Sequence, residues 1–383
     1  MHRREIPAGG FHFIDSTLRE GEQFRGTHFT IDDKREIAAL LDQFGVEYME
    51  LSTPIASPRS ADAIKAIADM PRSFKLLTHI RASLDDAKLA VECGVDGADV
   101  YIGTSNYMRE YSHGKSLDQV IEVGREVIAF LRDNDVETRF STEDTFRSNF
   151  ADVMTVYRAM DLAGVDRVGV ADTVGIADPL QTYNMISNLR DVVRCDIEFH
   201  GHNDSSCAVA NAFSALQAGA THIDTTVLGI GERNGITAMG ALIARLYTYD
   251  KALVEKYDLP LLAEIERVVA EKLGIDIPFN TPITGDVAFH HKAGVHTKAV
   301  LNNPITYEAI DPEDFGMSRV IDVAHRLVGR NAIRDRANGL GIDLEEDALQ
   351  SVTAQVKLLA DEQQITSDDV DRILNETMLP VDD

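Results

Sequence analysis

The chain has 383 residues, of which 44% are hydrophobic and 26% charged, so it can bury one large core and a small second one. Its formal net charge of −26 argues against a nucleic-acid partner, because binding to phosphates requires a basic surface. No apolar run is long enough for a membrane span, and the N-terminal MHRREIPAGG lacks the apolar core of a signal peptide. We therefore expect a cytoplasmic protein with no membrane partner, and its acidity fits either a high-salt habitat or an ordinary soluble protein.

Short apolar runs rich in β-branched residues alternate with longer segments of helical period over about the first 250 residues. This alternation predicts βα repetition and a parallel sheet. Eight strand-like runs predict an α/β protein built on a TIM (β/α)8 barrel. They fall at 11–16, 46–52, 74–80, 97–102, 136–141, 167–171, 196–200 and 221–227.

Four helical segments end in a glycine just before the next strand-like run, at Gly45, Gly94, Gly164 and Gly219. Glycine suits the left-handed position after a helix, so these turns lie at the bottom of the predicted barrel and the loops at the opposite end carry the chemistry. A doubly wound sheet is the alternative. It would require a glycine-rich phosphate turn after the first strand, and none follows 11–16.

Beyond Tyr249 the pattern changes to helical segments, then a loop-rich stretch, then helical segments again. We predict a catalytic barrel at 1–275 and, after it, mainly helical C-terminal subdomains. The first of these, at 276–320, is a linker subdomain that completes the active site, and the second, at 321–383, is small and helical.

Polar clusters follow the first and seventh predicted strands. The run DSTLREGEQ at 15–23 combines an arginine, carboxylates and an amide, which an anion site beside a metal ligand requires; a solvated loop with ion pairs is the alternative. The seventh strand ends in HGHND at 200–204. Residues two apart on a strand face the same side, so His200 and His202 can reach one ion, although two hydrogen-bonded histidines would give the same pattern.

These motifs resemble the signatures of a known family. LREGxQ at 18–23, followed by Lys34, is similar to the first signature of the isopropylmalate and homocitrate synthase family, and HxHND at 200–204 is similar to the second. The runs DSTLREGEQF, LTHIR, RFSTEDTFRS, VADTVG, LGIGERNGIT and HKAGVHTKA resemble homocitrate synthases most closely, and together they span nearly the whole chain. One departure is Ser206, where the second signature has glycine, and it leaves the exact 2-oxo acid open.

The resemblance implies that Glu20, His200 and His202 hold a divalent metal, either zinc, magnesium or manganese, with Asn203 as a further ligand or close neighbour. One carboxylate and two imidazoles leave coordination positions open. A 2-oxo acid can chelate there through its carboxylate and keto oxygens, so that the ion polarises the keto group. Arg19 would stabilise the alkoxide that develops on attack.

The catalytic base is also assigned by resemblance. Removal of a methyl proton from the co-substrate acetyl-CoA falls to His296, with Glu143 orienting it and Tyr307 nearby. This proton transfer would generate the carbon nucleophile of the reaction.

Substrate-binding residues complete the implied site. His79, Arg139 and Ser141 correspond to residues that bind the far carboxylate of 2-oxoglutarate in homocitrate synthases, whereas an isopropylmalate synthase would require an apolar pocket there. Gln23 would contact the substrate through its amide, and Thr173 would complete the site of the first carboxylate.

We therefore expect an acyltransferase, active as a homodimer, that condenses acetyl-CoA with a small 2-oxo diacid. The favoured reaction converts 2-oxoglutarate to homocitrate in lysine biosynthesis by the aminoadipate route. Three alternatives remain: a related synthase that uses oxaloacetate, phosphonopyruvate or 2-oxoisovalerate, a carbon–carbon lyase of the same metallolyase superfamily, and a non-catalytic ligand-binding barrel. The lyases carry a cysteine-containing glycine-rich loop that this sequence lacks.

Overall fold

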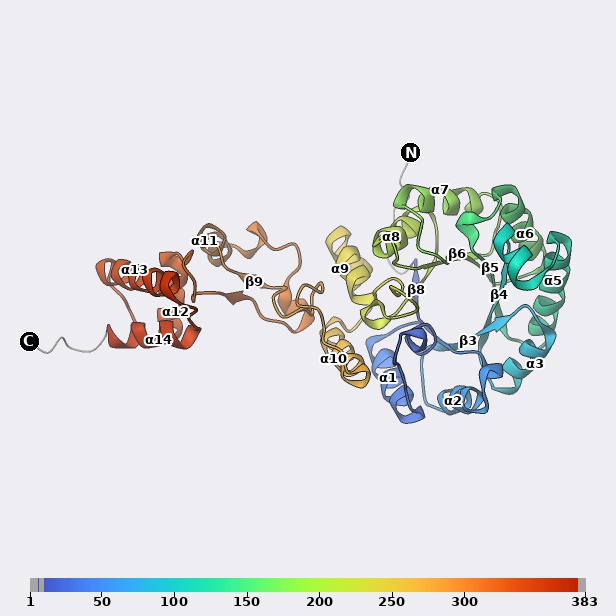
Figure 1. Cartoon of the computed structure of the whole chain (residues 1–383), viewed down its shortest axis with the longest axis horizontal. Helices are drawn as coiled ribbons and strands as arrows, with labels where there is room; N and C mark the ends of the chain where they lie inside the picture. The colour runs from blue at the N-terminus through green and yellow to red at the C-terminus, as the bar shows by residue number, and fades with distance from the viewer. Residues whose placement is uncertain (1–5, 7–9, 378–383) are drawn as a thin grey trace, which may run out of the picture. The chain divides into compact units, whose positions relative to one another are not determined.

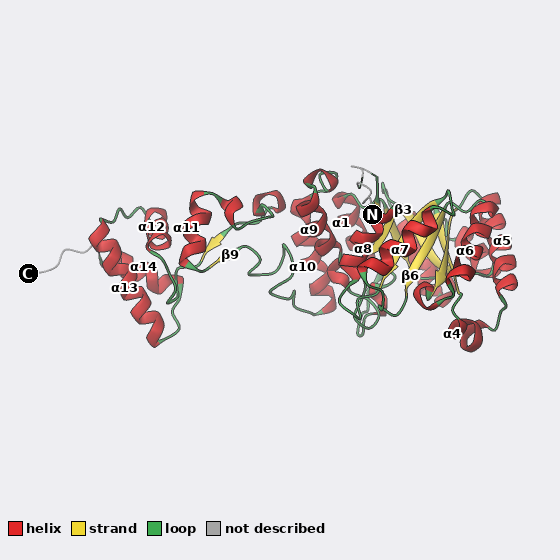
Figure 2. Cartoon of the chain, turned by 90° about the horizontal axis from the view of Figure 1, so that it is seen from above, coloured by secondary structure: helices red, strands yellow, loops and turns green. Residues whose placement is uncertain are grey.

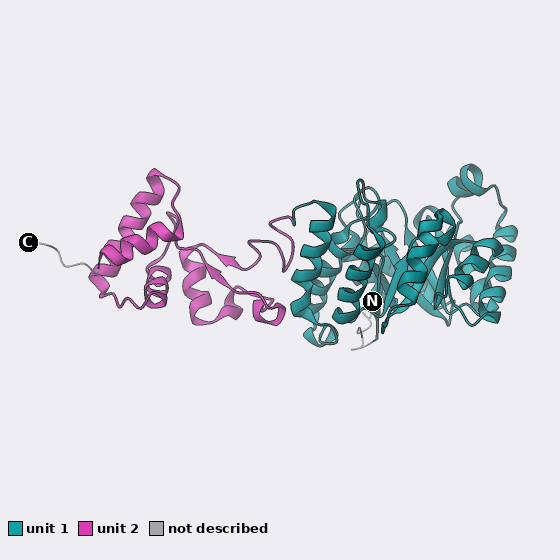
Figure 3. Cartoon of the chain, turned by 90° about the horizontal axis from the view of Figure 1, so that it is seen from below, with its two compact units in different colours: residues 1–277 teal, residues 278–383 magenta. Residues whose placement is uncertain are grey.

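The computed structural model describes residue 6 and residues 10–377. The chain divides into two compact units, Met1–Ile277 and Pro278–Asp383 (Figure 3). The finer division of the C-terminal part at residue 320 stays a prediction. No helix in the described ranges is long and apolar enough to cross a membrane.

The first unit is a closed barrel of eight parallel strands in chain order, with helices around the outside (Figure 1). The last strand pairs with the first, from His12 opposite His222 to Asp15 opposite Thr225, and this pairing closes the ring. The predicted TIM barrel is confirmed, since every predicted strand-like run overlaps one observed strand. The strands are β1 (His12–Asp15), β2 (Tyr48–Leu51), β3 (Lys75–Arg81), β4 (Gly97–Gly103), β5 (Glu137–Glu143), β6 (Arg167–Asp172), β7 (Asp196–Gly201) and β8 (His222–Thr225).

Local sequence signals set the helix ends of this unit. Thr30 and Asp33 form a capping box that begins α1, and Gly45 ends the same helix at φ 100°. Gly164 and Gly219 end α6 and α8 in the same left-handed way, as the sequence predicts. The helices are α1 (Ile31–Phe44), α2 (Pro58–Ala68), α3 (Leu84–Glu92), α4 (Asn106–Met108), α5 (Leu117–Asp133), α6 (Phe150–Ala163), α7 (Pro179–Arg190), α8 (Ala208–Ala218), α9 (Met239–Tyr249) and α10 (Leu262–Leu273).

The interior of the barrel contains charged side chains as well as apolar ones. Arg139 and Arg167 are among the largest fully buried side chains of the described residues. Glu198 accepts hydrogen bonds from both: Nε of Arg139 lies 2.6 Å from Oε1, and Nε of Arg167 lies 2.8 Å from Oε2. Buried charges persist when they are paired and hydrogen-bonded, so this network fixes Arg139 in one orientation beneath the open end of the barrel.

The second unit is mainly helical, which confirms the predicted character of the C-terminal region. Strands β9 (His290–His291) and β10 (Val320–Ile321) form a two-stranded parallel sheet. Val328, Ile333, Val352 and Val356 belong to a separate hydrophobic core. The helices are α11 (Gly294–Asn302), α12 (Arg330–Gly339), α13 (Glu346–Glu362) and α14 (Ser367–Glu376).

Candidate active site

A cavity of about 170 Å³ opens at the C-terminal ends of the barrel strands, where enzymes of this fold carry their active sites. The structure brings ten of the predicted site residues together in its lining. They are Arg19, Glu20, Gln23, His79, Arg139, Ser141, Glu143, Thr173, His200 and His202.

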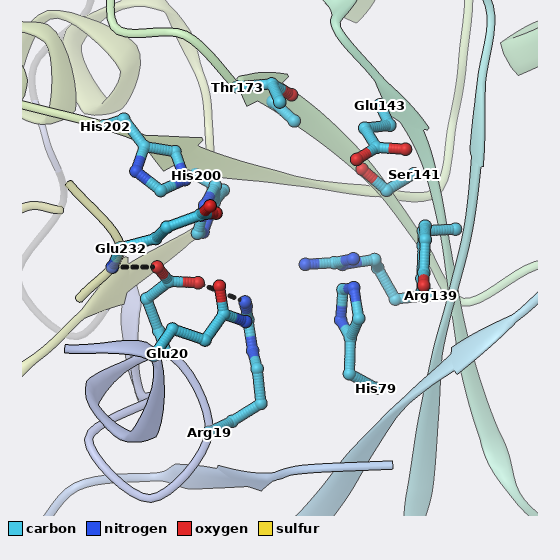
Figure 4. A pocket seen from close by; sticks show the side chains of 13 residues that line it. Arg19, Glu20, His79, Arg139, Ser141, Glu143, Thr173, His200, His202 and Glu232 are labelled. Atoms are coloured by element: carbon cyan, nitrogen blue, oxygen red, sulfur yellow. Dashed lines mark hydrogen bonds and ion pairs between the residues drawn. The ribbon is translucent and has the colours of Figure 1, made fainter. Parts of the chain in front are cut away.

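Three of these residues form a candidate metal site. Glu20 follows β1, whereas His200 lies in β7 and His202 just after it, and one ligand atom from each lies within 4.8 Å of the others (Figure 4). A carboxylate oxygen and two imidazole nitrogens are a donor set that fits zinc and related divalent cations. The buried Nδ1 of His202 has no hydrogen-bond partner within the described part of the chain. A buried polar atom without a partner is expected where an ion or another ligand binds.

The electrostatics of this cluster suit a cation. Burial, followed by the nearby Arg19 guanidinium, lowers the pKa of His200 to about 4, and burial together with His200 lowers the pKa of His202 to about 4. Burial raises the pKa of Glu20, but Arg19 and the two histidines outweigh it and lower the pKa overall. At neutral pH the cluster therefore presents one carboxylate and two neutral imidazoles, the protonation states that bind a metal.

A buried carboxylate on β8 supports one of the imidazoles. Nδ1 of His200 lies 2.8 Å from Oδ2 of Asp224, whose side chain is 0% exposed. When a carboxylate accepts this hydrogen bond, the proton resides on Nδ1 and Nε2 is left as a free lone pair. Burial, followed by Glu198 and Glu50, raises the pKa of Asp224 against the opposing effect of Arg139 and Arg19. The ionised form of Asp224 selects the tautomer of His200 that can ligate a cation, and a bound cation favours that form.

Cationic and hydrogen-bonding groups face this cluster across the cavity. Figure 4 shows Arg139 and His79 pointing into the cavity from the side opposite Glu20. Glu50 holds Nε of Arg19 at 2.6 Å and Nδ1 of His79 at 2.8 Å. Two guanidinium groups held by buried carboxylates suit a small substrate with more than one carboxylate.

Glu143 differs from the other acidic residues of the cavity. No hydrogen bond or ion pair of its carboxylate occurs among the described residues, and burial, followed by Asp144 and Glu232, raises its pKa. A carboxyl group of raised pKa beside a substrate cavity suits proton transfer.

The hydroxyls nearby have backbone partners, since Thr173 accepts from the N–H of Asp144 at 2.8 Å and Ser141 donates to the carbonyl of Gly169 at 3.0 Å.

The other predicted site residues lie outside this lining. Oδ1 of Asn203 accepts from the N–H of Ala208, the first residue of α8, at 3.2 Å, and a role at the metal stays a prediction. His296 and Tyr307 belong to the second unit, where their ring centroids are 4.2 Å apart. Their catalytic roles stay predictions too. Ser206 is exposed at φ 61° and does not line the cavity, so its departure from the signature affects a loop that favours glycine.

Sequence reasoning missed several residues that shape the site. Glu50 and Asp224 hold the arginine and histidine side chains, and each is an acidic residue in the middle of a strand-like run, a signal that could have identified them. Tyr101 stacks on the His79 ring at a centroid distance of 4.4 Å. The backbone N–H of Glu232 donates to Oε1 of Glu20 at 2.9 Å, and the LGIGERNGIT run pointed to this loop.

The fold and the cavity together define a TIM-barrel enzyme with a candidate metal site beside an anion pocket. Residues 10–269 match the family model described as HMGL-like, and residues 283–364 match the one described as homocitrate synthase post-HMGL domain-like. The chain belongs to the homocitrate synthase family.

Curated relatives carry this assignment, and a solved structure shares the fold. The chain is 53% identical to a mitochondrial homocitrate synthase of Schizosaccharomyces pombe over 367 aligned residues. These residues cover 96% of this chain and 88% of that protein. It is 52% identical over 365 residues to the cytosolic homocitrate synthase isozyme of Saccharomyces cerevisiae, with coverage of 95% and 85%. A crystal structure of a Bacillus subtilis HMG-CoA lyase shares the fold, with a TM-score of 0.63 at 22% identity over 71% of this chain and 97% of that one.

Proposed function

We propose that this protein condenses acetyl-CoA with 2-oxoglutarate and, after hydrolysis of the thioester, releases homocitrate and CoA for lysine biosynthesis. The observation that carries the proposal is the cavity itself, which places Glu20, His200 and His202 opposite the buried Arg139. A chelating 2-oxo acid would occupy the first side and its distal carboxylate the second. More than half of the residues are identical to those of homocitrate synthases over nearly the whole chain, which supports the same reaction.

The chemistry divides between the two sides of the cavity. A divalent cation held by Glu20, His200 and His202 would supply Lewis-acid polarisation of the substrate keto group. Arg19, a residue only 7% exposed, lies beside this cluster and would stabilise the negative charge that develops on the keto oxygen. Arg139 would hold the distal carboxylate on the other side.

The carbon nucleophile requires removal of a proton from the acetyl methyl group. Glu143, a carboxyl group of raised pKa without a hydrogen-bond partner among the described residues, lies in the cavity lining. In the proposed mechanism Glu143 orients His296 and stabilises its protonated form. His296 accepts the methyl proton, and Tyr307 assists beside it. The new carbon–carbon bond then forms between the acetyl methyl carbon and the keto carbon.

A thiol-release assay with acetyl-CoA across a panel of 2-oxo acids tests the function. We expect 2-oxoglutarate to be the best substrate and 2-oxoisovalerate to react slower by orders of magnitude, because an apolar end would accept no hydrogen bond from the part of the Arg139 guanidinium that lines the cavity. Oxaloacetate is the informative comparison, since it is also a diacid but shorter. A preference for 2-oxoisovalerate would reject the homocitrate assignment.

The proposal extends to a homodimer, a cytoplasmic location and a divalent metal cofactor. Relatives of similar identity are named both mitochondrial and cytosolic. Sedimentation analysis of the purified protein would give the oligomeric state, and fractionation of cells that produce it from its own gene would give the compartment. Elemental analysis of protein purified without added metal would identify the ion.

A further inference from the structure

Asp204 of the HxHND run and Arg233 of the LGIGERNGIT run belong to the sequence motifs but have no part in the proposed mechanism. The two side chains pair with each other at the open end of the barrel. Nε of Arg233 donates to Oδ1 of Asp204 at 2.9 Å, and Nη2 donates to Oδ2 at 3.0 Å. A two-pronged pair of this kind fixes the relative orientation of its partners as well as their distance. It therefore joins the loop after β7 to the loop after β8.

Arg233 also holds the loop after β6. Its Nη2 donates to the carbonyl oxygen of Thr173 at 2.8 Å. The same loop packs directly against Asp204, since a Cβ atom at Gly175 would lie 2.7 Å from the backbone nitrogen of Asp204. All three loops lie at the end of the barrel from which α4 projects in Figure 2, because the C-terminal ends of parallel strands lie together. One guanidinium group thus connects three loops of the site.

Each of these loops presents one group to the candidate metal site or to the cavity. His202 lies in the loop after β7, two residues before the carboxylate of the pair. Glu232 precedes the arginine in the loop after β8, and its backbone N–H donates to Oε1 of Glu20 at 2.9 Å (Figure 4). Thr173, in the loop after β6, lines the cavity. A shift of these loops relative to one another would therefore change the spacing of the candidate metal ligands.

The exposure and the backbone of Arg233 favour a role in geometry over a role in stability. Its side chain is 37% exposed and that of Asp204 is 23% exposed, and ion pairs at such exposure add little to the free energy of unfolding. Arg233 also has φ 55°, in the left-handed region that residues other than glycine rarely adopt. Residues in such conformations are held by their surroundings, and they are concentrated at active sites.

We propose that Arg233 is a positioning residue that holds the loops of the metal ligands at the spacing which binds a divalent cation. Its pair with Asp204 fixes the loop of His202, and its peptide bond to Glu232 fixes the N–H that binds Glu20. The inference rests on the proposed function, because it assumes that this cluster binds a metal. Arg233 is not among the residues that line the cavity, so it acts on the cation through the loops.

Arg233→Met separates this role from the charge of the arginine, because the two predict opposite changes. Loss of a positive charge near a metal site would by itself strengthen cation binding. Loss of the pair would weaken it, and we expect the metal dissociation constant to rise about 10-fold, as for other outer partners of metal ligands. Arg233→Lys keeps the charge but cannot form the two-pronged bond, so its dissociation constant should also rise. Competition with a chromophoric chelator measures both constants.

The matched control is Arg336→Met in the second unit. Arg336 forms the same two-pronged pair with Asp371, from Nε at 2.7 Å and from Nη2 at 2.6 Å, and its side chain is 40% exposed. Neither partner of this pair lines the cavity. The control variant should therefore keep the metal affinity of the wild type, whatever it loses in Tm.

Hydrogen exchange tests the connection between the three loops in protein freed of metal. Each loop contains a hydrogen-bonded amide, and these are the N–H groups of Gly175, Asn203 and Gly235. All three should exchange faster in Arg233→Met than in the wild type, because the group that joins their loops is lost. In Arg336→Met they should exchange at the wild-type rate. Faster exchange confined to the loop after β8 would show that Arg233 does not hold the other two loops, and the inference would fail.

The metal titration also distinguishes this inference from the proposed function. Weaker metal binding in Arg233→Met and Arg233→Lys, with wild-type affinity in Arg336→Met, supports the positioning role. Equal or tighter binding in Arg233→Met, when His200→Ala binds no metal, overturns the positioning role and leaves the proposed metal site intact. A wild-type protein that binds no divalent cation rejects the proposed metal site and the positioning role together.

Discussion

Removal of the Asp224 carboxylate should weaken metal binding without removing any metal ligand. Its Oδ2 lies 2.8 Å from Nδ1 of His200, and the side chain is 0% exposed. In Asp224→Ala the Nδ1–H group loses its partner in a buried place, and the ring can turn or change tautomer. We expect metal affinity to fall about 10–100-fold, which corresponds to about 1.4–2.7 kcal/mol.

Asp224→Asn refines the test, because its carbonyl can still accept from Nδ1 but carries no charge. Its affinity should lie between those of wild type and Asp224→Ala. Competition with a chromophoric chelator measures the dissociation constant directly, and the absorption spectrum of the cobalt-substituted protein reports ligand geometry.

Asp15→Asn is the matched control for a buried carboxylate. Asp15 is also 0% exposed and lies on the neighbouring strand β1, but its oxygens accept from the N–H and hydroxyl of Thr17 at 3.0 Å and not from a metal ligand. This variant should keep wild-type metal affinity even if it loses stability. The reasoning fails if Asp224→Ala binds metal as tightly as wild type while His200→Ala does not bind it.

Three further predictions concern histidines. His200→Ala and His202→Ala should each lose bound metal and activity together, and full metal content in both by elemental analysis would place the site elsewhere. His296→Ala should lower turnover about 10²–10⁴-fold with metal content intact, and wild-type deuterium exchange at the acetyl methyl would show that another group is the base. Burial, followed by the charge of Arg167, lowers the pKa of His222 from its ordinary 6.5, so the unfolded chain takes up the proton first as pH falls. From about pH 7.5 to 5.5 this costs the folded protein about 1.4 kcal/mol, so the Tm of His222→Gln should fall about 2 °C less than that of wild type, and parallel decreases would contradict the assignment.

The barrel was predictable because its signals are local. Strand-like runs, capping residues and glycines in left-handed positions each act over a few residues, and Gly45, Gly164 and Gly219 have φ of 100°, 86° and 112°. The position of HxHND after the seventh strand then placed His200 and His202 at the open end of the barrel.

The supporting carboxylates were not predictable in the same way, because their partners are distant in sequence. Glu50 and Arg19 are 31 residues apart, and Asp224 and His200 are 24 apart. Each pair forms only when neighbouring strands of the barrel pair, and an acidic residue in a strand-like run does not identify its partner. The predicted roles of His296 and Tyr307 rest on resemblance for a related reason, since both belong to the other compact unit.

The buried charges also explain why the character of the pocket is a property of the whole barrel. Arg139 lies in the cavity lining but is held from below by Glu198, which also accepts from Arg167, and it lies 3.5 Å from Asp224. An apolar residue in place of Arg139 would leave Glu198 buried with one partner fewer, a change that costs several kcal/mol in comparable ion pairs. A pocket for an apolar 2-oxo acid would therefore require joint replacement of the arginine and its acidic neighbours. Because this network is intact, Arg139 is stronger support for a diacid substrate than an isolated surface arginine would be.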